Sequence, residues 1–330
     1  MRPSNALRAW LDTMLASQGW EAAAIDAAKL QPLQTEASYR QFYRVQHGTR
    51  SLVLMDSPPA KERNTEFVNI AAALSAAEIT VPEVLAHNES AGWLLLSDLG
   101  QVHFIDRYRA GDHRSCLHSA LATLERLAAV RHPAIEPYTL ERFSDELEIF
   151  TTWLVDAACT LSLPDGLFQP ARKLLLQNAD DQQAVCVHRD FHCKNLLLMP
   201  SKQGDANDAP DTGVLDFQDA LIGPNGYDLA SLLHDCYWRF DDYTIDAIID
   251  RVAGVNRRSV DLLAVQRQLK AIGIFSRLAQ RDNKTSHLIH IEPVLANLTE
   301  LCARYPELRS LGDWLHTTLK APARRWVASQ

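Results

Sequence analysis

The chain has 330 residues, and its 33 Lys and Arg against 41 Asp and Glu give a formal net charge of −8. This acidic balance argues against a chain built to coat nucleic acid or an anionic membrane, so we expect neither as a partner. With 47% hydrophobic and 22% charged residues, the composition excludes a disordered or fibrous chain. At roughly 150 residues per domain, the length predicts two domains or one domain of two lobes.

Cysteine usage and hydropathy indicate a cytoplasmic protein. The six cysteines form no CxxC pair, so a structural zinc site and a disulfide framework are disfavoured and we expect reduced thiols. No run approaches about 18 consecutive apolar residues, the length that a membrane-spanning helix needs. Arg8 and Asp12 interrupt the apolar core that a signal peptide requires. We expect a monomer.

The first hundred residues are predicted to be rich in strands. They open on a helix whose apolar face includes Leu7, Leu11 and Leu15. Residues 38–56 indicate two strands joined by a turn at 47–49. The other elements expected here are a helix beginning near Asn64 or Thr65, a strand around Val84 and a strand within 92–100.

The rest of the chain is predicted to be helical apart from three short strands. Residues 101–183 have helical periodicity, including a helix over 144–156, and helices resume from Tyr227 to the C-terminus. A polar segment without periodicity at 201–212 predicts a mobile surface loop. The strands are expected at 184–190, 195–199 and 213–217.

These elements predict an α+β fold of two lobes. We expect a small strand-rich lobe over residues 1–97 and a larger helical lobe over 98–330 that carries the short strands. A hinge is expected near residues 97–100, where the last strand of the small lobe ends.

The common phosphate-binding and hydrolase motifs are absent. The sequence has no GxxxxGK[ST] and no GxGxxG, which disfavours a Walker-type NTPase and a Rossmann dinucleotide enzyme. It also has no GxSxG and no HExxH. The chemistry is carried instead by two other segments, HRDFHCKN at 188–195 and LDFQD at 215–219.

These two segments predict a magnesium site beside a free carboxylate. Asn195 opens one short strand and Asp216 ends the next, so two strands joined by a long loop bring both side chains together. Their oxygens suit Mg²⁺, which takes few protein ligands and keeps waters and substrate phosphates. Asp190 lies beside them as a carboxylate placed to accept a proton from an attacking hydroxyl. This set predicts metal-assisted phosphoryl transfer.

A metallohydrolase is the rival interpretation of the same residues. His188, Asp190 and His192 alternate along the chain, and together with Asp216 they could ligate a transition metal. That interpretation leaves Asn195 and the hinge unexplained, so we rank it lower. For His188 we favour a structural role, in which its ring holds the loop by hydrogen bonds.

The two segments resemble the aminoglycoside phosphotransferase and choline kinase branch of the protein-kinase-like fold. HRDFHCKN is similar to the catalytic loop of that family, and LDFQDALIGPNGYDLA is similar to its metal-binding segment and following helix. Over most of residues 5–325 the chain looks like the bacterial kinases that phosphorylate the anomeric hydroxyl of N-acetylmuramate and N-acetylglucosamine in cell-wall recycling. The segments that carry this second resemblance are SYRQFYRV, LVLMDSPP, LLLSDLG, GPNGYDLASLLHD and FSRLAQRDNK.

The resemblance implies a bilobal kinase that uses ATP and Mg²⁺. Asp190 would be the catalytic base, Asn195 and Asp216 the Mg²⁺ ligands, and Asp228 a structural residue that holds the catalytic loop. The adenine would meet the backbone of the hinge residues Leu96, Ser97, Asp98 and Leu99.

One position departs from the family pattern. Kinase-like folds usually place a lysine on the third strand to grip the ATP phosphates, whereas LVLMD puts Met55 at that position. Glu66, the expected partner of that lysine, loses its role for the same reason. The cations that could replace the lysine are Arg40 and Arg44, in or beside the first hairpin, and Lys61.

The acceptor site is less clearly predicted. Sugar sites combine an aromatic ring with carboxylates and amides, and Glu146 and Trp153, seven residues apart, would share one face of the 144–156 helix. Asp219 could also reach the acceptor. The lactyl carboxylate of N-acetylmuramate would need a cation, for which FSRLAQRDNK offers Arg277, Arg281 and Lys284.

Two other functions remain open beside the sugar kinase and the metallohydrolase. A kinase of the same fold could act on a cationic acceptor such as an aminoglycoside, choline or homoserine, and the net charge of −8 mildly favours this. An inactive nucleotide-binding scaffold would explain Met55. A scaffold has no physical need for Asp190, Asn195 and Asp216 together, which argues against it.

Overall fold

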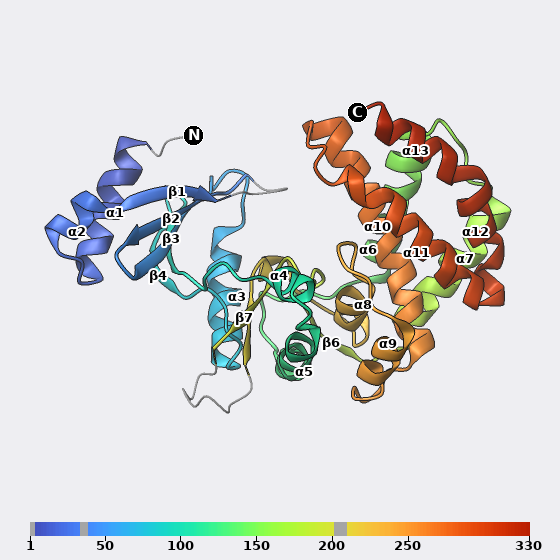
Figure 1. Cartoon of the computed structure of the whole chain (residues 1–330), viewed down its shortest axis with the longest axis horizontal. Helices are drawn as coiled ribbons and strands as arrows, with labels where there is room; N and C mark the ends of the chain where they lie inside the picture. The colour runs from blue at the N-terminus through green and yellow to red at the C-terminus, as the bar shows by residue number, and fades with distance from the viewer. Residues whose placement is uncertain (1–3, 34–38, 201–209) are drawn as a thin grey trace.

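The structure is a computed structural model, and it describes residues 4–33, 39–200 and 210–330. A sheet with its helices forms one end of the molecule, and a larger bundle of helices forms the other end (Figure 1). The expected α+β architecture, with its small sheet-bearing part and its larger helical part, is confirmed.

The small part is built on a five-stranded antiparallel sheet. Its strands lie in the order β1-β2-β3-β5-β4, and β2 pairs with β3 along its whole length as the predicted hairpin. The elements of this part are α1 (Asn5–Ser17), α2 (Ala22–Ala27), β1 (Lys29–Leu33), β2 (Gln41–His47), β3 (Arg50–Asp56), α3 (Asn64–Ala76), β4 (Val84–Asn88) and β5 (Trp93–Ser97).

Alternation along the strands gives this sheet two buried faces. Successive side chains of a strand point to opposite faces, and Leu54 packs with α1 and α2 in one apolar cluster. Its neighbour Met55 packs with α3 in the other cluster, beside Leu94 and Leu96. The face that carries Met55 is the one that continues toward the helical part.

The large part holds two pairs of short antiparallel strands among its helices, β6 with β9 and β7 with β8. Its α-helices and strands are α4 (Phe104–Arg109), α5 (His113–Ala129), α6 (Leu140–Ile149), α7 (Asp165–Asp180), β6 (Ala184–Val187), β7 (Leu196–Met199), β8 (Asp211–Val214), β9 (Leu221–Pro224), α8 (Tyr227–Leu233), α9 (Asp242–Ile249), α10 (Arg257–Asp282), α11 (Ile291–Arg304), α12 (Arg309–Trp314) and α13 (Lys320–Ala328). Two π-helices occur at Phe150–Ala158 and Leu315–Leu319, and 3₁₀ turns at Phe217–Asp219, Leu288–His290 and Pro306–Leu308.

Helix α10 is the 26-residue centre of this bundle, and most of its middle is buried. It approaches α6 very closely at Gly273, where an added Cβ would lie 2.7 Å from backbone atoms of Ile149 and Phe150. The contacted backbone is the point where α6 ends and the π-helix begins. A glycine at this position therefore allows two helix backbones to meet directly.

Several local predictions need correction. The helix expected over 144–156 is α6 followed by the π-helix, and β1 and β9 were not predicted. The strand expected at 213–217 ends at Val214, so Asp216 follows it in a turn. Most of the expected surface loop at 201–212 lies outside the described residues.

Within the described residues, no helix has the length and apolar character needed to cross a bilayer.

Candidate active site

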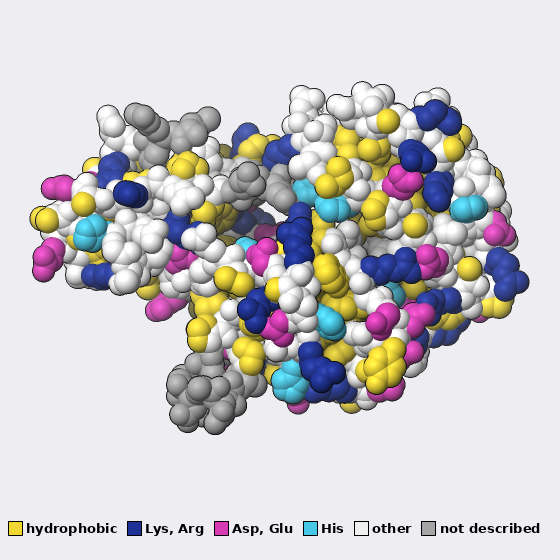
Figure 2. All heavy atoms as spheres, in the orientation of Figure 1, with side chains coloured by type: hydrophobic (Ala, Val, Ile, Leu, Met, Phe, Trp, Pro, Cys, Tyr) yellow, Lys and Arg dark blue, Asp and Glu magenta, His cyan; other side chains and the backbone are white. Residues whose placement is uncertain are grey.

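A large cavity lies between the two parts of the molecule, where Figure 2 shows the surface hollowed. Its volume is about 1050 Å³, at the upper end of the range for small-molecule sites. The lining comes from β2 and β3, from the segment that follows β5, from the two predicted catalytic segments and from α10. A cavity of this size can hold a nucleotide and a second small molecule together.

The loop after β6 carries Asp190 into this cavity. Asp228, near the start of α8, accepts hydrogen bonds from the backbone N–H of His188 at 2.6 Å and of Arg189 at 2.8 Å. These bonds fix the backbone of the loop, while the Asp190 side chain keeps 42% of its surface exposed. Asp190 is therefore held in place and remains accessible to a substrate in the cavity.

Both ring nitrogens of His188 form hydrogen bonds within the protein. Its Nδ1 accepts from the backbone N–H of Asp190 at 3.2 Å, so Nε2 carries the proton and donates to the carbonyl of Leu215 at 2.8 Å. The ring thus ties the catalytic loop to the segment before Asp216. Both nitrogens are engaged, and neither is available to a metal.

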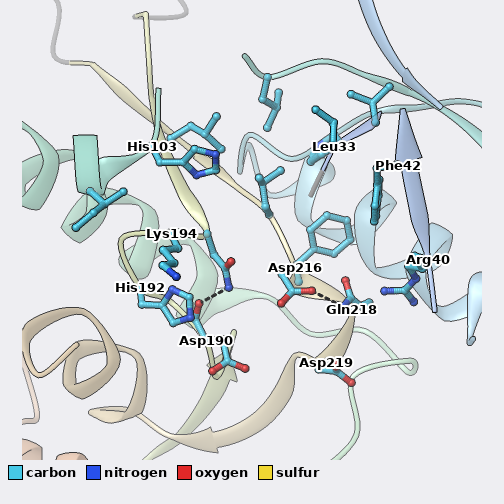
Figure 3. A pocket seen from close by; sticks show the side chains of 18 of the residues that line it. Leu33, Arg40, Phe42, His103, Asp190, His192, Lys194, Asp216, Gln218 and Asp219 are labelled. Carbon is cyan, nitrogen blue, oxygen red and sulfur yellow. Dashed lines mark hydrogen bonds between the residues drawn. The ribbon is translucent and has the colours of Figure 1, made fainter. Parts of the chain in front are cut away.

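Strand pairing brings Asn195 and Asp216 to the same place. β7 and β8 are antiparallel, and the backbone N–H of Leu215 donates to the carbonyl of Asn195 at 2.9 Å. Asp216 has a φ of 62°, a left-handed conformation that turns the chain directly after the strand. Its Oδ1 accepts from Gln218 at 2.7 Å, and Figure 3 shows the carboxylate beside the open part of the cavity.

The donor set at this point fits Mg²⁺. Asn195 uses Nδ2 to donate to the carbonyl of Asp190 at 3.0 Å, so its Oδ1 is the side-chain atom suited to a cation. One amide oxygen and the carboxylate of Asp216 are the few hard ligands that Mg²⁺ takes from a protein in phosphate chemistry. No group of three or more His, Cys, Asp and Glu side chains able to hold a metal occurs in the described parts of the chain. The transition-metal set expected for a metallohydrolase is not assembled.

Two cations of α10 dominate the electrostatics around Asp190. Nη2 of Arg267 lies 3.4 Å from Oδ1 of Asp190, and Lys270 also lines the cavity. Burial alone raises the pKa of the Asp190 carboxyl, but Lys270 and Arg267 outweigh it and hold that pKa well below its usual range. The carboxylate is therefore charged. The sequence analysis did not single out either cation, because neither belongs to a recognisable motif.

The four predicted hinge residues, Leu96 to Leu99, all line the cavity. Asp98 accepts two hydrogen bonds from Arg44, at 2.6 and 2.9 Å, and a further one from Ser51. Burial raises the pKa of the Asp98 carboxyl, but the bonds from Arg44 and Ser51 hold it below the usual range. The charge of Arg44 is thus matched within the small part of the molecule.

The structure shows the surroundings of Met55, at the position where the family has the strand lysine. Val53 lines the cavity, and Met55, on the same face of β3, is fully buried in the apolar cluster under α3. Glu66, on α3, accepts a hydrogen bond from Nε of Arg63 at 3.0 Å.

Arg40 and Lys61 also line the cavity. Figure 3 shows Arg40 directed toward Gln218 and Asp216. Its Nη2 lies 3.2 Å from Glu62, and its guanidinium stacks over Phe67 at 5.5 Å. Lys61 lies over the ring of Tyr39 at 4.1 Å.

Of the predicted acceptor residues, the structure brings only Asp219 into this cavity. Glu146 is buried and accepts hydrogen bonds from Tyr138 and Arg189, with Lys270 at 3.4 Å. The candidates that do not belong to the described lining of the cavity are Glu146, Trp153, Arg277, Arg281 and Lys284.

Comparisons with known proteins place the chain in a family. Residues 29–263 match the model of the phosphotransferase enzyme family. A protein of Pseudomonas aeruginosa named N-acetylmuramate/N-acetylglucosamine kinase is 34% identical, with 94% of this chain and 95% of that protein aligned. A protein of Neisseria meningitidis with the same name is 30% identical, with 94% of each chain aligned.

Solved structures share the fold. A choline/ethanolamine kinase family protein of Mesorhizobium loti superimposes with a TM-score of 0.62 at 14% identity, covering 98% of this chain and all of that one. The GDP complex of wild-type aminoglycoside 2'-phosphotransferase-IIIa superimposes with a TM-score of 0.60 at 16% identity, covering 89% and 99% of the two chains. The resemblance inferred from the two catalytic segments is confirmed, and the chain belongs to the phosphotransferase enzyme family.

Proposed function

We propose that the protein transfers the γ-phosphoryl group of ATP to the anomeric (C1) hydroxyl of N-acetylmuramate or N-acetylglucosamine, in the cytoplasm and as part of peptidoglycan recycling. The names of the aligned relatives support the class of acceptor, and the alignments extend over nearly the whole length of both chains.

The single observation that carries the proposal is the meeting of Asp190, Asn195 and Asp216 at one cavity. Asp190 accepts the proton of the acceptor hydroxyl as the oxygen attacks phosphorus. Asn195 and Asp216 hold Mg²⁺, which neutralises charge on the phosphates. The hydrogen bonds that Asp228 accepts from the loop backbone, and the bond from the His188 ring to Leu215, fix the loop, so little reorganisation is needed during the reaction.

The donor nucleotide lies against the small part of the molecule in this proposal. The backbone of the Leu96 to Leu99 segment meets the adenine, and Arg44 fixes that segment through Asp98. Arg40 takes the place of the strand lysine, because it lines the cavity and is directed toward Asp216.

The wall formed by α10 favours a neutral or anionic acceptor over a cationic one. Its residues at the cavity include Arg267 and Lys270, and the others have no charge. Arg267 is paired with Asp190 and Lys270 with Glu146, so the described α10 residues at the cavity include no carboxylate to match an ammonium group. An N-acetylated sugar carries no such charge. Asp219, which also lines the cavity, is the carboxylate that we assign to the sugar hydroxyls.

A panel of acceptors tests the proposal. The purified chain is incubated with ATP, Mg²⁺ and one of N-acetylmuramate, N-acetylglucosamine, choline, homoserine or kanamycin, and ADP release is measured. We expect turnover with the two amino sugars. Phosphorus NMR of the N-acetylglucosamine product should show a resonance coupled to the anomeric proton. Coupling to the C6 protons contradicts C1 transfer, and turnover with only choline, homoserine or kanamycin contradicts the sugar assignment.

A further inference from the structure

Asp190 is in contact with an arginine that lies far from it in the sequence. Arg267 is only 3% exposed in the middle of α10. Its Nη2 lies 3.4 Å from Oδ1 of Asp190, and its Nε donates to the backbone carbonyl of Arg189 at 3.4 Å. The guanidinium therefore touches the carboxylate of Asp190 and the backbone of the residue before it.

A buried guanidinium is costly unless it is matched by an anion. Asp190 is the carboxylate within ion-pair distance of Arg267 among the residues that the structure describes. Burial raises the pKa of the neighbouring Cys236 thiol to about 12, so that thiol is neutral and does not supply the counter-charge. Nη1 of Arg267 is also buried without a hydrogen-bond partner in the described part of the chain. Packing alone does not explain an arginine at this position.

The second cation of α10 has a different set of contacts. Nζ of Lys270 lies 3.1 Å from the hydroxyl of Tyr227 and 3.4 Å from Oε2 of Glu146. Lys270 adds to the positive field at Asp190, but its contacts are with these two side chains. Of these two cations, Arg267 is the one with a directional contact that can fix how the Asp190 carboxylate is turned.

We infer that Arg267 is a positioning residue for the phosphoryl transfer: it holds Oδ1 of Asp190 and thereby turns Oδ2 toward the acceptor hydroxyl. The inference rests on the proposed function, in which Asp190 is the base. A carboxylate on a single rotatable side chain has many orientations, and a base works only in a narrow range of them. The guanidinium of Arg267 restricts the orientation of the Asp190 side chain, while the bonds that Asp228 accepts restrict the backbone of the loop.

A kinetic double-mutant cycle tests this role. We expect Arg267→Met to lower kcat roughly 10- to 100-fold, the effect of a slightly misplaced reacting group, with the KM for ATP changed less than about twofold. Arg267→Lys should fall between the wild type and Arg267→Met, because an ammonium keeps the charge but not the fork. In an Asp190→Asn background, Arg267→Met should cause no further fall in kcat, since both changes act through one group. An equal fall in both backgrounds overturns the inference.

Arg258 provides the matched control. It is an arginine of the same helix with its own carboxylate partner, Glu307 at 2.9 Å, but it lies on the surface away from the cavity. Arg258→Met should leave kcat unchanged. A fall in kcat equal to that of Arg267→Met would show that disturbing α10 alone is sufficient, and it would overturn the positioning role.

A second cycle needs no acceptor and separates the inference from the proposed function. The melting temperatures of the wild type, Arg267→Met, Asp190→Asn and the double variant should be non-additive, because the two side chains are partners. Additive shifts show that no such contact exists and overturn the inference, even if the acceptor panel succeeds. A wild type that phosphorylates no amino sugar overturns the proposed function, and the contact is still decided by this cycle.

Discussion

The positively charged side chains on the two walls of the cavity differ in where their carboxylate partners lie. On the side of the sheet, Arg44 of β2 is matched by Asp98, directly after β5, and Arg40 lies beside Glu62. On the side of α10, Arg267 reaches across to the catalytic loop and Lys270 reaches Glu146 on α6. The ion pairs of the first wall connect segments beside the sheet. Those of the second wall connect α10 to the catalytic loop and to α6, around Asp190.

This difference predicts which property of the protein the removal of each charge should change. A change on the α10 side or in the catalytic loop should act on the chemical step, because the reacting groups are there. A change on the sheet side should act on nucleotide binding or on stability.

The change expected to have the largest effect is Asp216→Ala. It removes the only carboxylate of the proposed Mg²⁺ pair, and we expect kcat to fall about 1000-fold or more, since metal neutralisation of phosphate charge contributes several kcal/mol. Steady-state rates over a range of Mg²⁺ concentrations measure this. Asp211→Asn, on the same strand pair but paired with Arg126, is the control. Unchanged Mg²⁺ dependence in Asp216→Ala would locate the metal elsewhere.

The next effect is expected for Asp190→Asn, which keeps the shape of the side chain and removes its basicity. The kcat should fall roughly 10²- to 10⁴-fold, the usual contribution of a positioned general base. Nucleotide binding, measured by calorimetry with ADP and Mg²⁺, should stay near the wild-type value. Turnover close to that of the wild type would remove Asp190 from the role of base.

On the sheet side, restoring the family lysine should damage the protein. Met55 is fully buried in an apolar cluster, so Met55→Lys places an unpaired ammonium there. We expect the free energy of unfolding to fall by about 3–5 kcal/mol, measured by urea denaturation. Met55→Leu should cost less than about 1.5 kcal/mol. A Met55→Lys variant as stable as the wild type, with tighter ATP binding, would show that this wall still accepts the lysine.

The smallest effect is expected for Arg40→Met, also on the sheet side. If Arg40 grips the phosphates, the KM for ATP should rise roughly 10-fold, equivalent to one lost charged hydrogen bond, with kcat little changed. Arg50→Met is a suitable control, because Arg50 lies on the adjacent strand and donates to the carbonyls of Gln18 and Gly19. An equal KM in both variants would exclude Arg40 from the nucleotide site.

The catalytic loop could be predicted from the sequence because its chemistry is contiguous. His188, Asp190 and Asn195 occupy one eight-residue segment, and Asp216 follows on the next strand of the same pair. The first hairpin and α3 could be predicted for a similar reason, since local periodicity and turn residues specify them. β1 is five residues long, contains Pro32 and is mostly exposed, so it lacks the alternating pattern of a strand. β9 is four residues long and pairs with β6, far earlier in the chain, so local patterns did not show it.

The cations expected at the acceptor site are close in sequence to those that line the cavity. Arg277 and Arg281 lie near the C-terminal end of α10 and Lys284 follows it, and none of the three belongs to the described lining of the cavity. The residues at the cavity recur with helical spacing at 267, 270, 271, 274, 275 and 278. Residue 281 follows the same helical spacing but lies beyond 278, the last residue of α10 at the cavity, and residue 277 lies at the edge of that repeat. How far the cavity extends along α10 depends on how the helix packs against its neighbours, and no motif records it.

The backbone contact at Gly273 affects the width of the cavity. It lies on α10 well around from the cavity face, in direct backbone contact with the start of the π-helix. Any side chain there would push α10 off this support and toward the cavity, shifting Arg267 and narrowing the space for the acceptor at once. One backbone contact at Gly273 therefore affects both the width of the cavity and the position of Arg267 beside Asp190.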